Sequence, residues 1–61
     1  MKKVYLLYDA RYLYDEDRAT VFEFCDNIKE ARQNAPDYGT DTVIVEYTDN
    51  SGLLENAKIV S

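Results

Sequence analysis

Carboxylates are the side chains of this sequence that could do the most chemistry. The chain has 61 residues, with twelve Asp or Glu against seven Lys or Arg, and it has no histidine. Glu23 and Glu46 each stand inside an apolar run, where burial would raise a carboxyl pKa toward the range of a general acid or base. Because so short a chain leaves little volume for a substrate pocket, we expect both glutamates to face solvent or to pair with Arg11 or Arg32. The sequence therefore predicts a protein that is not an enzyme.

Three consecutive acidic residues, Asp15, Glu16 and Asp17, suggest a cation site, because hard cations bind several carboxylate oxygens on one loop. The spacing of an EF-hand would require further oxygen ligands where this chain has Ala19 and Val21. We therefore predict a solvated turn at this position, with no bound metal and no cofactor.

The single cysteine, Cys25, stands just before an expected helix. With no histidine to act as a base, and with Glu23 and Asp26 opposing the thiolate, we expect a small buried apolar side chain. One cysteine also excludes an internal disulfide and any Cys/His zinc site, so association with another chain is the remaining means of stabilising so small a domain.

The charge of the chain is unevenly distributed. Between Gln33 and Ala57 there is no Lys or Arg but there are five Asp or Glu, which equals the net charge of −5 of the whole sequence. A negative surface repels nucleic acid and attracts basic proteins, although it also serves solubility alone. We expect the partner-binding residues to be Asp15, Glu16, Asp17, Asp37, Tyr38, Asp41, Asp49 and Glu55.

Hydrophobic patterning divides the chain into two hairpins around one helix. Asn27 and Glu30 have the spacing of a capping box, and Pro36 should end the helix at about Asn34. Alternating and β-branched runs predict strands at residues 3–14, 19–25, 42–48 and 53–60. The expected fold is a single α+β domain, residues 1–61, ordered ββαββ, with a mostly antiparallel four-stranded sheet and one short helix packed on one face.

One short helix cannot cover both faces of a four-stranded sheet, yet the first strand is apolar on both. We expect Val4, Leu6 and Tyr8 to face the core. A homodimer would cover the other face, unless strand twist and long side chains already do so. The dimer contacts expected are Tyr5, Leu7, Leu13, Tyr12 and Tyr14.

These observations lead to one principal hypothesis about function. It is a small acidic, non-enzymatic interaction module of the cytoplasm that occupies the basic nucleic-acid-binding surface of a partner, as DNA-mimic or virus-encoded anti-defence proteins do. The alternative is a dimeric ligand-binding or regulatory module, with its pocket between helix and sheet or across the dimer. A minimal enzyme using Glu23 or Glu46 is a third hypothesis. No apolar run is long enough for a membrane span.

Overall fold

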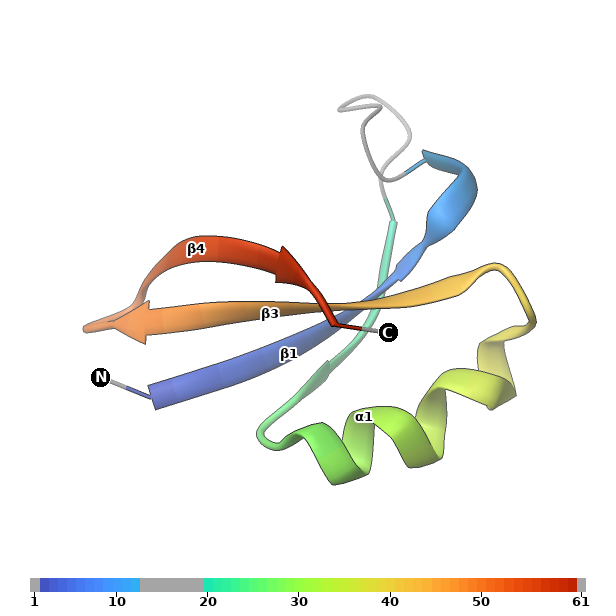
Figure 1. Cartoon of the computed structure of the whole chain (residues 1–61), viewed down its shortest axis with the longest axis horizontal. Coiled ribbons are helices and arrows are strands. Elements are labelled where there is room, and N and C mark those ends of the chain that lie inside the picture. The colour runs from blue at the N-terminus through green and yellow to red at the C-terminus, as the bar shows by residue number, and fades with distance from the viewer. Residues whose placement is uncertain (1, 13–19, 61) are drawn as a thin grey trace.

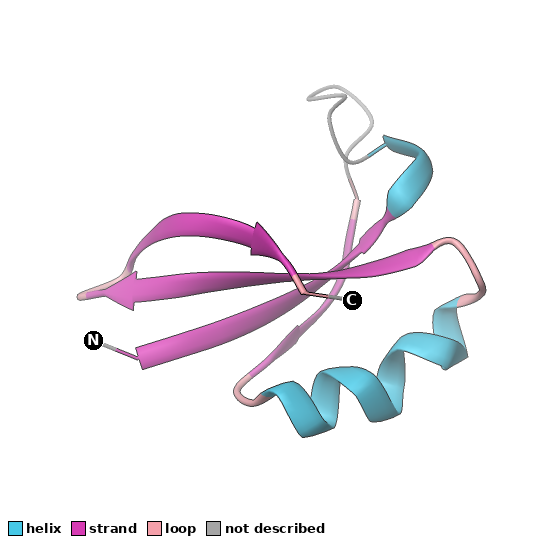
Figure 2. Cartoon of the chain, viewed as in Figure 1, coloured by secondary structure: helices cyan, strands magenta, loops and turns pink. Residues whose placement is uncertain are grey.

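The computed structural model describes residues 2–12 and 20–60. Its strands are β1 (Lys2–Asp9), β2 (Val21–Cys25), β3 (Thr42–Asn50) and β4 (Leu53–Ile59). Helix α1 (Ile28–Asn34) continues directly into a 3-10 turn, η2 (Ala35–Tyr38), and a second such turn, η1 (Ala10–Tyr12), follows β1. The strands form one antiparallel sheet in the order β2-β1-β3-β4, with α1 on one side (Figures 1 and 2). The α+β class, with a four-stranded antiparallel sheet and one short helix, is confirmed.

The start of α1 follows the capping chemistry expected from the sequence. Asn27 is extended, with φ −146°, and its side chain accepts a hydrogen bond of 2.8 Å from the backbone N–H of Glu30. This bond satisfies one of the amide groups that the first helical turn leaves without a partner. The helix ends at Asn34 as predicted, and the chain continues as η2, where Pro36 stands in the first turn.

The core lies between α1 and the face of the sheet that the helix covers. It contains Tyr5 and Leu7 of β1, Ile44 of β3, Cys25 of β2 and Ala31 of α1. Ala31 is fully buried, so the small side chain lets the helix approach the sheet closely. Partly buried apolar residues surround this cluster: Phe22, Ile28, Ala35 and Val60.

Two residues expected at a dimer interface belong instead to this core. Tyr5 is 8% exposed and Leu7 is fully buried under α1, so neither offers surface to a second copy. Since β1 is apolar on both faces, its pattern alone does not say which face meets the helix. Of the other three residues expected at the dimer interface, Tyr12 lies in η1, and Leu13 and Tyr14 lie outside the described residues.

Strand β1 is shorter than the predicted run to residue 14. It ends at Asp9, whose side chain accepts a hydrogen bond of 3.0 Å from the backbone N–H of Arg11. This contact closes a local turn of the kind Asp side chains favour, and it competes with continued strand pairing. Alternation of polar and apolar residues does not reveal such a turn.

The second hairpin turns at Ser51 and Gly52, both of which have positive φ, at 55° and 95°. Two successive positive φ values give the tight turn whose twist matches that of the adjoining strands. The backbone N–H of Gly52 also donates to the side chain of Asp49 at 2.9 Å. This confirms the hairpin predicted between residues 49 and 52. Among the helices described, none is long and apolar enough to cross a membrane.

Candidate functional site

Glu23, one of the two carboxylates considered for catalysis, ties β2 to the helical segment. Its Oε1 accepts a hydrogen bond of 2.9 Å from the hydroxyl of Tyr38, and its Oε2 accepts bonds from the Asn34 amide and the Cys25 thiol. The bonds from Cys25, Asn34 and Tyr38 lower the pKa of Glu23 below its usual value. The group is therefore a carboxylate whose oxygens are occupied, which suits a structural role and not that of a proton acceptor.

Cys25 shares this environment. Its thiol donates to Glu23 at 3.1 Å, and burial, followed by that hydrogen bond, raises its pKa to about 12. Glu23, Cys25 and Glu30 bring their potential ligand atoms within 4.8 Å of one another. A metal bound there would require the thiolate, which this environment strongly disfavours. The structure thus gives Cys25 the character of a buried apolar residue.

Glu46, the second carboxylate, is also partnered, although not by Arg11 or Arg32. Its Oε2 accepts a hydrogen bond of 3.2 Å from the hydroxyl of Tyr5, and its Oε1 lies 3.7 Å from Nζ of Lys3. In the register of the sheet it stands opposite Lys58 of β4. These contacts and the pairing with Lys58 join β1, β3 and β4.

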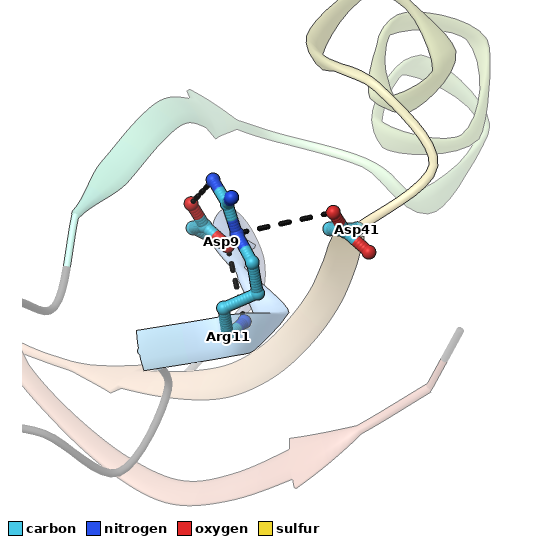
Figure 3. A network of polar contacts seen from close by, with 3 residues as sticks. All are labelled: Asp9, Arg11 and Asp41. Carbon is cyan, nitrogen blue, oxygen red and sulfur yellow. Dashed lines mark hydrogen bonds and ion pairs between the residues drawn. The ribbon is translucent and has the colours of Figure 1, made fainter.

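A compact ionic network lies at the end of β1 (Figure 3). The Arg11 guanidinium donates two hydrogen bonds to the nearly buried carboxylate of Asp9, at 3.1 and 2.8 Å, and its Nε lies 3.8 Å from an oxygen of Asp41. The backbone N–H of Ala10 also donates to the carbonyl of Asp41 at 2.6 Å. The fork-like pairing holds Arg11 against Asp9, and the two contacts with Asp41 connect the end of β1 to the start of β3.

The residues expected to bind a partner are divided between two ends of the sheet. Asp37, Tyr38 and Asp41 lie just before β3, whereas Asp49 and Glu55 lie at the distal hairpin. Asp41 and Asp49 are eight residues apart along extended chain, or roughly 26 Å. Asp15, Glu16 and Asp17 lie outside the described residues. The four expected carboxylates that the structure describes therefore form two separate groups and not one continuous patch.

Between these groups, the face of the sheet opposite α1 is apolar. Cross-strand pairing aligns Phe24 with Leu6, Leu6 with Val45, and Val45 with Ile59, which gives one row across all four strands. Adjacent positions on the same face are occupied by Val4, Tyr8, Val21, Val43, Tyr47 and Leu54. We call this surface the open face.

Exposure changes along the row. The central Leu6 and Val45 are 8% and 4% exposed, whereas Phe24 and Ile59 at the edge strands are 52% and 48% exposed. Sheet twist and neighbouring side chains therefore cover the centre, and the apolar surface that remains accessible lies along the two edges. Tyr8 and Tyr47 pair their hydroxyls at 3.1 Å, so their polar atoms are already engaged.

Sequence patterns did not single out Phe24 and Ile59. The pattern that could have pointed to them is the alternation of apolar residues in β2 and β4. Alternation alone, however, does not say which face of the sheet α1 covers. That information lies in the register, which pairs Phe24 with Leu6 and Ile59 with Val45. A one-residue shift would place both side chains on the opposite face.

Comparison with protein-family models, with curated proteins and with solved structures finds no match for this chain.

Proposed function

We propose that the protein is a non-enzymatic interaction module that binds a basic protein partner through the open face and the acidic groups at its two ends. The observation that supports this proposal is the apolar row from Phe24 to Ile59, which crosses the sheet and is half exposed at both edges. Burying the exposed half of two such side chains contributes about 1 kcal/mol each.

The charge of the chain favours a basic partner. Asp37 and Asp41 flank one end of β3 and Asp49 and Glu55 the other, in a chain with a net charge of −5. Negative groups around an apolar centre accelerate encounter with a positive surface and disfavour other partners. Since nucleic-acid-binding proteins expose such surfaces, we propose that the module occupies one of them, as a DNA mimic or a virus-encoded inhibitor would. Its cytoplasmic location is part of this proposal.

A second copy of the chain is the competing occupant of the open face. Four strands about 4.8 Å apart and five or six residues long outline roughly 350 Å², whereas stable interfaces bury about 800 Å² on each partner. A homodimer would also bring together two chains that each carry a net charge of −5, so the two copies would repel each other. A basic partner that also covers the acidic ends buries more surface and gains electrostatic attraction, so we favour it over the homodimer.

The proposal can be tested by affinity capture from cell extract with matched variants, followed by titration of the captured protein in purified form. Phe24→Asp with Ile59→Asp disrupts the open face, and Asp37→Lys with Asp49→Lys reverses one charge at each end, Asp49 being paired with Leu54 of the open face. Leu53→Asp is the control, because Leu53 is 61% exposed and pairs with Asn50 on the other face. Circular dichroism establishes that each variant is folded.

We expect wild type and the Leu53 variant to bind the same basic protein. The open-face variant should lose this protein, and the charge-reversed variant should bind it at least about tenfold more weakly, with affinity falling as salt increases. Equal binding by all variants would refute the proposal. Sedimentation showing a dimer of wild type that only the open-face variant dissociates would assign the face to a second copy instead.

A further inference from the structure

A cleft of about 430 Å³ lies between the helical segment and the start of β3, on the side of the sheet opposite the open face. Its floor includes the buried Ile44, and its walls include Ala35 and Pro36 of η2 and Arg32 in the last turn of α1. The volume falls in the range of small-molecule sites, and most of the lining named here is apolar.

Arg32 supplies a positive charge to this cleft. Within residues 2–12 and 20–60, no ion pair or hydrogen bond engages its guanidinium, although the chain carries an excess of carboxylates. The other arginine described, Arg11, is held by Asp9. Burial raises the pKa of the nearby Tyr5 and the charge of Arg32 opposes this slightly, while the planar pair of N–H donors of Arg32 can bind an anion.

Thr42 supplies a second unusual group. Its hydroxyl is buried and has no hydrogen-bond partner among the described residues, and the residue lines the cleft. A buried hydroxyl without a partner destabilises a fold, so its retention calls for an explanation. Because the hydroxyl oxygen is buried, it would reach a ligand in the cleft only after a change of χ1 by about 120°, to the next staggered rotamer.

The charges around the cleft restrict the ligand. Arg32 is its one charged lining residue, while Asp37 and Asp41 stand nearby in a chain of net charge −5. Polyanions such as nucleotides are repelled by this field and would need several cations. A monoanion with a short apolar body matches one guanidinium, one hydroxyl and an apolar floor.

We infer that the cleft binds a small organic carboxylate. Arg32 pairs with its carboxylate group, the Thr42 hydroxyl donates to the same group, and the apolar body lies on Ile44 and Pro36. This site is independent of the open face, so it holds or fails separately from the proposed protein interaction.

The test is an NMR titration of the full chain with isovalerate and benzoate, and with the uncharged amides isovaleramide and benzamide. The variants are Arg32→Gln and Thr42→Val, and Lys29→Gln is the control because Lys29 is an exposed cation of the same helix outside the cleft lining. We expect a Kd of about 1 mM for a carboxylate, typical of so small a ligand in a shallow site.

Amide signals of residues 35–44 should shift with the carboxylates. Arg32→Gln should weaken binding at least about tenfold, and Lys29→Gln should leave it unchanged. Thr42→Val should raise the Tm of the free protein and lower its affinity for the carboxylates. Binding of the amides as tightly as the carboxylates, an unaffected Arg32 variant, or no shift up to 50 mM would overturn the inference. If the Thr42 variant bound the carboxylates with unchanged affinity, the Thr42 hydroxyl would take no part in binding them.

Discussion

The carboxylates of this protein differ in what they contact, and this decides what each can do. Asp9, Glu23 and Glu46 each accept a hydrogen bond from a side chain, which comes from η1, α1 and β1 respectively. Asp37, by contrast, is exposed at the edge of η2. Composition alone treats these groups alike, because the fold decides which donors reach them: Arg11 is two residues from Asp9, whereas Tyr5 is 41 residues from Glu46. Glu23, for example, meets Asn34 only after the chain has turned from β2 into α1.

Asp9 provides a pH-dependent test at this scale. The side-chain hydrogen bonds from Arg11 lower the pKa of Asp9 below its ordinary value of 3.8, against the opposing effect of burial. A carboxyl group whose pKa is lower in the folded state than in the unfolded state stabilises the fold at pH values above the unfolded-state pKa. This stability is lost as the pH falls through the folded-state pKa. Asp9→Asn should therefore reduce stability at pH 7 and have a much smaller effect near pH 2.

Urea unfolding at intervals between pH 7 and pH 2 measures this effect. Asp37→Asn is the control, since Asp37 lies outside the ionic network. The interpretation fails if the difference between wild type and Asp9→Asn is the same at every pH.

At the scale of elements, local signals predicted most boundaries correctly. Asn27 and Glu30 marked the start of α1, Pro36 marked its end, and the Ser51-Gly52 turn marked the second hairpin. Each signal acts within a few residues, which is why the sequence reveals it. The end of β1 was missed because the Asp9 turn is an alternative to strand pairing that has no distinctive spacing. The face covered by α1 was missed because β1 is apolar on both sides.

The cap of α1 is open to direct measurement. Asn27→Ala removes the acceptor for the Glu30 amide and should destabilise the protein by about 1 kcal/mol. For a domain of this size, that corresponds to a fall in Tm of about 4–8 °C. Asn27→Asp keeps an acceptor oxygen and should retain most of the stability. Thermal unfolding followed by circular dichroism distinguishes the two, and equal losses would indicate that the cap bond contributes nothing.

At the scale of the whole molecule, the strand order separates features that are close in sequence. Since β3 runs the length of the sheet, the acidic residues on its two sides in sequence lie at opposite ends in space. The sequence predicted four strands and one helix but not their order, because order depends on which strand edges pair by backbone hydrogen bonds, and no local pattern specifies this. The division of the acidic residues, the open face and the cleft all depend on that order.

The small core makes this arrangement sensitive to single truncations. A domain of 61 residues has a total stability of about 3–9 kcal/mol. Leu7→Ala empties a fully buried position and should cost about 2–5 kcal/mol. Leu53→Ala, at a position 61% exposed, should change stability by less than about 0.5 kcal/mol. Urea unfolding compares the two, and similar losses would show that Leu7 is not a core residue.

The central position of β1 has a consequence for the kinetics of folding. Its residues pair with those of β3 about forty positions later, as Tyr5 does with Glu46. When the chain is synthesised from its N-terminus, β1 must remain unpaired on one side until β3 has left the ribosome. Contacts so distant in sequence slow folding, because the intervening chain must be ordered before they form. During that interval the apolar residues of β1 are available to chaperones and to other nascent chains.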